Sequence, residues 1–218
     1  MKTSIWLFDL DNTLHRADKG IFYLINRRMT VFLQRRLHIG EAEADRLRAH
    51  YWHEYGATLT GLRLHHPEIS LRDFLAFSHP MDEILPKLVP EAGTATLLSR
   101  LHGRKAVFSN GPGFYVRTLI GGLGLSETFE ALFGTDDLDF ACKPQSEAYH
   151  AVCKQLDVPP EQCILVDDSA GNLHTAKQLG MTTVLFGPQA HELPFADGTA
   201  RNMAELYAWA ERRSLTAD

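Results

Sequence analysis

IWLFDLDNTL, residues Ile5 to Leu14, is the most informative stretch of this sequence. A short apolar strand is expected to end at Phe8, and two carboxylates, Asp9 and Asp11, follow it at once. In an extended chain, residues two apart lie on the same face, so both carboxylates are expected to point to one side of the strand end. The alternative is an Asx turn that simply ends the strand, because Asp and Asn are common there.

Polar residues also follow two later apolar runs and precede one helical pattern. One run leads into Ser109 and Asn110, and another leads into Asp167 and Asp168. Lys143 stands before a proline, just ahead of a helical pattern. Taken singly, each has an ordinary structural explanation, such as a helix cap, a solvated charge or an acidic loop. Because the carboxyl ends of parallel strands open on one crevice, the elements together indicate a single site.

The charges in that crevice predict what it binds. Four carboxylates (Asp9, Asp11, Asp167 and Asp168) lying close together would raise one another's pKa values, and the single Lys143 does not offset them. A divalent cation with oxygen ligands does, and Mg²⁺ suits a site that also takes a phosphate. A nucleophilic carboxylate, Mg²⁺, a lysine and hydroxyl and amide donors together predict phosphoryl transfer through a covalent aspartyl phosphate.

Short apolar runs alternate with helical patterns along most of the chain, which predicts an α/β fold with a mostly parallel sheet flanked by helices. The runs lack a clear polar alternation, as expected for strands buried on both faces. The expected strands are Ser4–Phe8, Lys105–Phe108, Ala131–Gly134, Cys163–Val166 and Thr182–Phe186. The expected helices are Gly93–Leu101, Gly113–Leu123, Gln145–Leu156, Asn172–Leu179 and Ala204–Arg212.

One long segment after the first strand departs from this alternation. It has no strand candidate, but apolar residues from Ile21 to Leu33 recur at helical spacing on one face. Further helices are expected at Glu41–Tyr55 and Leu71–Phe77, with Ser70 as the N-cap of the latter. Such an insertion commonly closes over a site at the strand ends. The predicted domains are an all-helical cap at 17–85 and an α/β core at 1–16 and 86–218.

Composition and charge exclude several classes of protein. With 22 basic and 27 acidic residues among 218, the net charge of −5 argues against a nucleic-acid polymer or a membrane surface as partner. No apolar run is long enough to span a bilayer, and the N-terminus lacks the apolar stretch of a signal peptide. The three cysteines have no CxxC spacing, which disfavours a disulfide framework or a zinc ribbon. These features predict a cytoplasmic protein.

The motifs DLDNTL, SN, KP and DDS, in this order, resemble the four-part pattern of the haloacid dehalogenase (HAD) superfamily, over roughly Lys2–Ala17 and Pro86–Phe186. The resemblance implies a Rossmann-like core with the helical cap inserted after the first strand. It also implies that Asp9 is the nucleophile. Asp11 would be the general acid and base that protonates the leaving alcohol and later activates water.

The same resemblance implies the residues that bind the phosphoryl group. Ser109 and Asn110 would hold the transferring group, and Lys143 would steady the phosphorylated Asp9.

The resemblance also implies a set of Mg²⁺ ligands. They are the carboxylates of Asp9 and Asp168 and the backbone carbonyl of Asp11. Asp167 would then act on the metal through water or through a ligand rather than by direct contact.

The presence of Asp11 argues against the dehalogenase reaction, whose leaving group requires no proton, and favours cleavage of a phosphate ester. A narrower resemblance lies in the predicted cap, where Tyr51–Leu62 (YWHEYGATLTGL) is similar to a stretch of the pyrimidine 5′-nucleotidase branch. His15 stands where that branch usually has tyrosine. Because His15 follows the catalytic loop by four residues and is expected to face the cap, we assign it to substrate binding.

The sequence thus predicts a Mg²⁺-dependent phosphomonoesterase whose substrate is a small molecule, a nucleoside 5′-monophosphate. The alternatives are a phosphatase or phosphomutase acting on small sugar phosphates, and a non-catalytic binding protein with the same fold. The oligomeric state is left open. Several cap residues either stack on a base or fill the cap core: Tyr51, Trp52, Tyr55, His50, His53, His65 and His66.

Overall fold

A parallel sheet of six strands runs through the computed structural model, which describes residues 4–216. The strand order is β3-β2-β1-β4-β5-β6. The strands are β1 (Ile5–Phe8), β2 (Arg104–Phe108), β3 (Ala131–Phe133), β4 (Cys163–Asp167), β5 (Thr182–Phe186) and β6 (Gly198–Ala200). The predicted α/β class is confirmed, and each of the five predicted strands forms within one residue of its expected bounds.

Strand β1 lies at the point where the chain changes direction across the sheet. Its last residue, Phe8, pairs with Val107 of β2 on one side and with Val166 of β4 on the other. The residues that follow these three strands therefore come to the same edge. In open α/β sheets, ligands bind at this switch point, outside the carboxyl ends of the strands.

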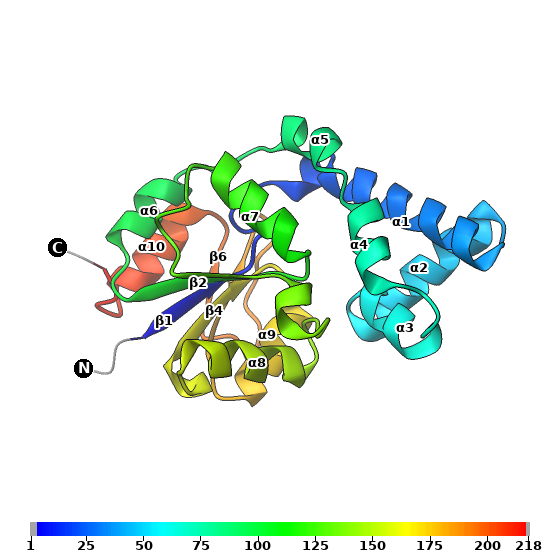
Figure 1. Cartoon of the computed structure of the whole chain (residues 1–218). Helices are drawn as coiled ribbons and strands as arrows, with labels where there is room; N and C mark the ends of the chain where they lie inside the picture. The colour runs from blue at the N-terminus through cyan, green and yellow to red at the C-terminus, as the bar shows by residue number, and fades with distance from the viewer. Residues whose placement is uncertain (1–3, 217–218) are drawn as a thin grey trace.

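Helices cover both faces of the sheet (Figure 1). On one face, Trp6 and Phe8 belong to a hydrophobic cluster with residues of α6, α7 and α10. On the other face, Ile5 and Leu7 belong to a cluster with residues of α8 and α9. Both faces of β1 are buried, which explains why its sequence shows no polar alternation. These helices are α6 (Thr94–Arg100), α7 (Gly113–Gly122), α8 (Ser146–Leu156), α9 (Ala170–Gln178) and α10 (Met203–Glu211).

A helical insert follows β1 and projects to one side of the sheet (Figure 1). The helical insert comprises α1 to α5. Helices α1 to α4 share a third hydrophobic cluster that includes Leu33, Leu62 and Phe74, whereas Ile84 of α5 belongs to the cluster on the Trp6 face of the sheet. Ser70 caps α4 as predicted, because its side chain accepts a hydrogen bond from the backbone N–H of Asp73. The helices are α1 (Ile21–Leu37), α2 (Glu41–Tyr55), α3 (Thr58–His65), α4 (Leu71–Ser78) and α5 (Met81–Ile84).

The helical insert also contacts the core at a place remote from its two chain connections. The side chain of Gln145 donates to the backbone carbonyl of Tyr55 (2.5 Å) and accepts from the hydroxyl of Thr60 (3.2 Å). A Cβ atom at Gly56, whose φ is +78°, would lie 2.2 Å from Pro144 Cδ, so only glycine fits this close approach. We propose that residues 17–85 form a domain distinct from the α/β core, because most of the helices of this segment share a separate hydrophobic cluster.

Three elements were not anticipated from the sequence. The insert helix α3 begins TLTG, and β-branched residues and glycine are poor helix formers, so its tertiary packing outweighs its propensity. Strand β6 has only three residues and lies at the sheet edge. The short helix α5 follows Pro80.

Within residues 4–216, the structure contains no helix with the length and apolar character needed to cross a membrane.

Candidate active site

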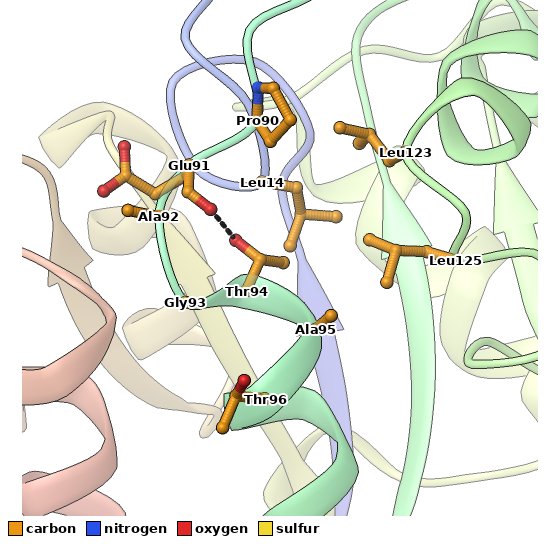
Figure 2. Close-up of a pocket in the computed structure, with 10 residues that line it drawn as sticks. All are labelled: Leu14, Pro90, Glu91, Ala92, Gly93, Thr94, Ala95, Thr96, Leu123 and Leu125. Atoms are coloured by element: carbon orange, nitrogen blue, oxygen red, sulfur yellow. Dashed lines mark hydrogen bonds between the residues drawn. The ribbon is translucent and has the colours of Figure 1, made fainter.

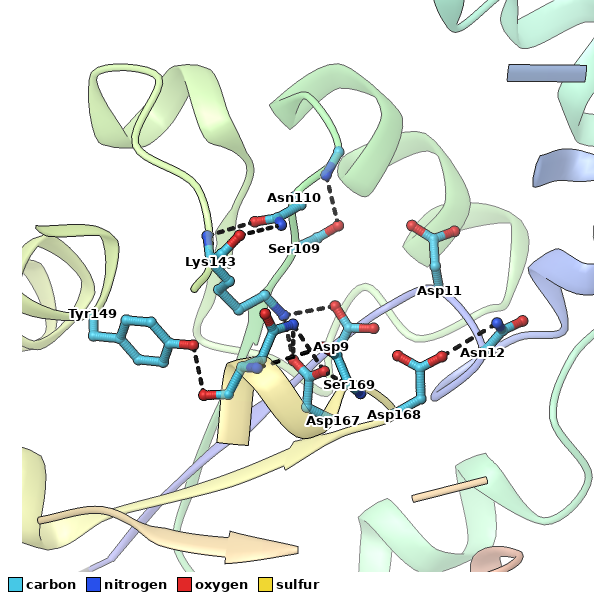
Figure 3. Close-up of polar contacts among 12 residues, drawn as sticks. Asp9, Asp11, Asn12, Ser109, Asn110, Lys143, Tyr149, Asp167, Asp168 and Ser169 are labelled. Carbon is cyan, nitrogen blue, oxygen red and sulfur yellow. Dashed lines mark hydrogen bonds and ion pairs between the residues drawn. The ribbon is translucent and has the colours of Figure 1, made fainter. Parts of the chain in front are cut away.

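The carboxyl edge of the sheet gathers the polar residues that the sequence singles out (Figure 3). Asp9 follows β1, Ser109 follows β2 and Asp167 ends β4. Lys143 enters from the loop that precedes α8. All four are buried, although buried polar groups are costly unless they are paired. Their pairing therefore defines the site.

Lys143 is the cationic centre of this cluster. Its Nζ lies 2.7 Å from Asp9 Oδ1 and 2.6 Å from Asp167 Oδ2, and it stands over the ring of Phe108. Burial alone would lower the pKa of Lys143, but the charges and hydrogen bonds of the two aspartates raise it above its ordinary value. Lys143 is therefore a permanent ammonium that fixes one oxygen of Asp9.

The negative charges nevertheless exceed the positive ones. Burial raises the pKa of Asp9 well above its ordinary value, Lys143 opposes this, and the charges of Asp167, Asp168 and Asp11 add to it. Burial and then the charge of Asp167 raise the pKa of Asp168 to about 7. One lysine cannot neutralise this many carboxylates. The cluster is thus suited to a cation.

Oxygens of Asp9, Asp167 and Asp168 lie within 4.8 Å of one another, close enough to hold a metal ion. Asp167 and Asp168 are adjacent in the chain but differ in how many hydrogen bonds their carboxylates already accept. Asp167 is buried and accepts from Lys143, from the backbone N–H of Ser169 and from the side chain of Asn172.

Asp168 keeps part of its surface exposed to solvent, although neighbouring atoms cover much of its carboxyl group, and it accepts one hydrogen bond, from Asn12 Nδ2 at 3.2 Å. Asp168 therefore keeps more free lone pairs for a cation than Asp167 does. This difference favours Asp168 as a direct ligand.

The segment after β2 contains Ser109, which offers a hydroxyl group to the site, and Asn110, which holds the loop that carries Lys143. Ser109 Oγ accepts from the backbone N–H of Gly111 at 3.0 Å, which leaves the hydroxyl proton free to donate. The side-chain amide of Asn110 forms two hydrogen bonds of 2.8 Å with the backbone of Lys143, one to its N–H and one to its carbonyl. The amide of Asn110 therefore orients the Lys143 loop, and a contact with phosphate would come from its backbone N–H.

Asp11 has different surroundings from Asp9. Its Oδ1 accepts from the hydroxyl of Tyr115 at 2.5 Å and lies 2.9 Å from Nε2 of His15. Burial would raise the pKa of Asp11, but the contacts with His15 and Tyr115 outweigh it and lower this pKa. Asp11 is therefore a carboxylate held by two neighbouring donors.

The structure places His15 differently from our expectation. Instead of facing the cap, its side chain has no exposed surface and lies against Asp11. The reason is local, because the backbone of His15 bridges to Asp11 and to Pro90, which fixes this part of the chain against the core. His15 therefore contacts the carboxylate of Asp11 and does not face the helical insert.

The aromatic and histidine residues of the helical insert mostly contact one another. Tyr51 is buried, its ring stacks on His65, and its hydroxyl lies 2.9 Å from His66 Nε2. Tyr55 pairs with His65 at 2.8 Å. These contacts agree with the interpretation of this group as packing, whereas Trp52 is exposed.

Three further residues near the site were given no role by the sequence. Tyr115 lies 104 positions from Asp11, inside a helix that was predicted without any role. Asn172, whose side chain donates to Asp167, is the first residue of an expected helix. His79 is buried, and its ring meets that of Tyr115 edge-on at 5.1 Å.

A hollow of about 250 Å³ lies away from these residues, between the start of α6 and the end of α7 (Figure 2). Its wall includes Leu14, Leu123 and Leu125, and the hydroxyl of Thr94 donates to the carbonyl of Glu91 beside it. None of the site carboxylates lines it. The chemistry therefore lies at the strand ends and not in this hollow.

Residues 4–180 match the family model for haloacid dehalogenase-like hydrolases, so the chain belongs to this family of hydrolases. It is 28% identical over 194 residues to a phosphoglycolate phosphatase of Colwellia psychrerythraea, covering 83% of this chain and 82% of that protein. It is 31% identical over 103 residues to a 6-phosphogluconate phosphatase of Escherichia coli, covering 47% of this chain and 46% of that protein.

Among solved structures, a HAD phosphatase from Thermococcus onnurineus superposes with a TM-score of 0.67 at 22% identity, covering 94% of this chain and 97% of that one. This likeness shows the fold. None of these three relatives is named a nucleotidase, so the comparisons do not support the narrower resemblance drawn from Tyr51–Leu62.

Proposed function

We propose that this hydrolase is a Mg²⁺-dependent phosphatase that cleaves small phosphomonoesters of the sugar-phosphate or phosphoglycolate class through an aspartyl phosphate on Asp9. The observation that carries the proposal is the pairing of a buried Asp9 with Lys143 at 2.7 Å, beside an excess of carboxylates at the strand ends. The names of the two sequence relatives support a small phosphorylated acid or sugar as substrate.

In the first step an oxygen of Asp9 attacks phosphorus. The bond from phosphorus to the leaving oxygen breaks, and its electron pair stays on that oxygen, which takes a proton from Asp11. Lys143 orients Asp9 by holding Oδ1 and leaves Oδ2 available for the attack. The negative charge of the bound phosphoryl group raises the pKa of a nearby carboxyl, which allows Asp11 to carry this proton.

In the second step water attacks the phosphorus of the aspartyl phosphate. Asp11, now a carboxylate, removes the proton from the water, the bond from phosphorus to Asp9 breaks, and inorganic phosphate is released. Asp11 has given its proton to the leaving oxygen in the first step, so it is in the form that accepts one. Ser109 would donate its hydroxyl proton to a phosphoryl oxygen, as would the backbone N–H of Asn110.

The residues present fit a divalent cation. The excess of carboxylates over Lys143, with oxygen ligands within 4.8 Å, matches the oxygen donors that Mg²⁺ requires. Asp9, Asp168 and the backbone carbonyl of Asp11 would hold the ion. When bound, it supplies positive charge that offsets the carboxylates and the phosphoryl oxygens.

Nucleoside 5′-monophosphates are the second candidate class, favoured only by the sequence of Tyr51–Leu62. The structure weakens this candidate because Tyr51 is buried within the helical insert. A sugar phosphomutase is a third possibility, which differs from a phosphatase in returning the phosphoryl group to the sugar.

The test is phosphate release with Mg²⁺ from phosphoglycolate, a panel of sugar phosphates and the nucleoside monophosphates. We expect the highest kcat/KM for a member of the first two groups. A clear lead for a nucleotide would overturn the substrate class, and isomerised sugar phosphate without free phosphate would show a mutase. No turnover on any compound would contradict the phosphatase itself. Asp9→Asn serves as the inactive control.

A further inference from the structure

The two oxygens of Asp11 are used unequally. Both side-chain contacts, from Tyr115 and from His15, go to Oδ1. Among the hydrogen bonds of residues 4–216, none involves Oδ2. The side chain of Asp11 keeps 17% of its surface exposed. One edge of the carboxylate is therefore fixed by the protein, while the other edge stays free.

The two residues that hold Oδ1 are rigidly placed. His15 and Tyr115 are both wholly buried, and they come from the loop after β1 and from α7. The ring of Tyr115 passes so close to Gly111 that a Cβ there would lie 2.6 Å from it. The ring of His79 also packs edge-on against the ring of Tyr115, with 5.1 Å between ring centres. Neither donor can swing away without disturbing the core.

The chemistry of each group makes it a donor. The hydroxyl of Tyr115 donates to Asp11 Oδ1, because a carboxylate oxygen can only accept. Nδ1 of His15 is buried and has no hydrogen-bond partner. The tautomer with the proton on Nε2 leaves no N–H unpaired at Nδ1, and it places that proton on Asp11 Oδ1.

We propose that Tyr115 and His15 are positioning residues that clamp Oδ1 of Asp11, so that Oδ2 alone exchanges the proton with the leaving alcohol and with water. This inference rests on the proposed phosphatase function. It adds that the geometry of the acid depends on two side chains outside the four motifs. Because they act only through Asp11, their loss affects proton transfer and not the attack by Asp9.

This division predicts a dependence on the leaving group. An alkyl alcohol leaves as a strongly basic alkoxide and needs a proton from Asp11 as the bond to phosphorus breaks. A nitrophenol leaves as a weakly basic phenolate and needs little help from a general acid. Loss of the clamp therefore slows alkyl phosphates selectively, whereas a general loss of folded enzyme slows both substrates equally.

The experiment measures kcat and KM of Tyr115→Phe with Mg²⁺, using the best alkyl phosphate of the panel and p-nitrophenyl phosphate. Because the lost hydrogen bond is to a charged group, we expect kcat for the alkyl phosphate to fall by at least about tenfold. KM should stay within about twofold, and the kcat for p-nitrophenyl phosphate should change by less than about threefold. Tyr51→Phe is the matched control, because it also removes a buried tyrosine hydroxyl, but one that contacts His66.

His15 is tested in the same way with two variants. His15→Ala removes the donor, whereas His15→Gln keeps an N–H at a similar distance along the side chain. We expect the alanine variant to lose alkyl-phosphate turnover selectively by about tenfold or more and the glutamine variant to recover most of it. Thermal unfolding of each variant shows whether the fold is retained, and the comparison of His15→Ala with His15→Gln provides the test if Tyr115→Phe does not fold.

The outcomes separate the inference from the proposed function. If the wild-type enzyme hydrolyses the panel and Asp11→Asn shows the leaving-group dependence, the phosphatase mechanism stands. Equal losses on both substrates in Tyr115→Phe, or no loss at all, would then overturn the clamp alone. If Asp11→Asn itself shows no such dependence, the acid role of Asp11 fails, and the clamp fails with it.

Discussion

Asp9 and Asp11 are two residues apart in the chain, yet the protein holds them in opposite ways. Asp9 is held by a full charge, Lys143, amid other carboxylates, and its pKa is raised. Asp11 is held by the donors Tyr115 and His15, and its pKa is lowered. The difference places the two carboxylates in distinct electrostatic surroundings, which agrees with the different tasks proposed for them.

The largest expected effect is the loss of activity when Asp9 is replaced, which unlike loss of the acid Asp11 does not depend on the leaving group. Asp9→Asn removes the attacking oxygen, so we expect kcat to fall by at least about 10⁴-fold on every substrate, whatever its leaving group. Phosphate release measures this, and trapping of phosphate on the protein from a labelled substrate should disappear as well. Asp73→Asn, at an exposed carboxylate that pairs with Arg36, should keep full activity. Substantial turnover by Asp9→Asn would refute covalent catalysis at this residue.

The next largest effect is on the stability of the protein, through the ion pairs of Lys143 with Asp9 and Asp167. Lys143→Met leaves Asp9 and Asp167 buried without their cation, so the free energy of unfolding without Mg²⁺ should fall by about 3–5 kcal/mol. Denaturant titration measures it. The matched control is Lys177→Met, which breaks a partly exposed pair with Asp197 and should cost at most about 1 kcal/mol. Similar losses in the two variants would contradict the account of Lys143.

Binding of Mg²⁺ to the carboxylates around Asp9 should stabilise the folded protein. At a concentration of 100 times its Kd, the ion should add about 2.7 kcal/mol to the free energy of unfolding, and EDTA should remove both this gain and the turnover. Asp168→Asn should weaken the gain, because it removes a proposed ligand. Asp11→Asn should preserve it, since only the backbone carbonyl of that residue is assigned to the ion. Equal loss in both variants would show that the Asp11 side chain also binds the metal.

The smallest effect is a dependence of the free energy of unfolding on pH, caused by His79, which packs against Tyr115 near Asp11. Burial lowers the pKa of His79 to about 4, whereas an unfolded histidine titrates near about 6.5. Between these values only the unfolded chain takes up the proton, so His79 lowers stability as pH falls, by about 2 kcal/mol at about pH 5. His79→Gln should lose this share of the difference in unfolding free energy between pH 8 and pH 5. The exposed His191→Gln should retain the wild-type pH dependence.

The sequence predicts the core well because local patterns there coincide with the topology. Apolar runs locate β1, β2 and β4, and the rule that ligands bind at carboxyl strand ends brings together residues more than 150 positions apart, such as Asp9 and Asp168. The parallel register of β1 with its two neighbours realises this rule.

The remainder depends on contacts that no local pattern encodes. Tyr115 reaches Asp11 across 104 positions, and only the packing of α7 against the sheet creates that contact. His15 turns inward because its backbone bridges to Pro90, a residue 75 positions later. The aromatic stretch of the insert suggested a nucleotide, whereas its side chains mostly pack on one another.

The attachment of the helical insert at Gln145 has a consequence for the timing of a catalytic cycle. Gln145 lies two residues after Lys143, and its two hydrogen bonds to Tyr55 and Thr60 must break if the insert swings away to admit substrate or release product. The same loop is locked to Asn110 through the backbone of Lys143. The residue that holds the nucleophile and the residue that holds the insert thus lie on one loop, so a movement of the insert away from Gln145 would begin two residues from Lys143.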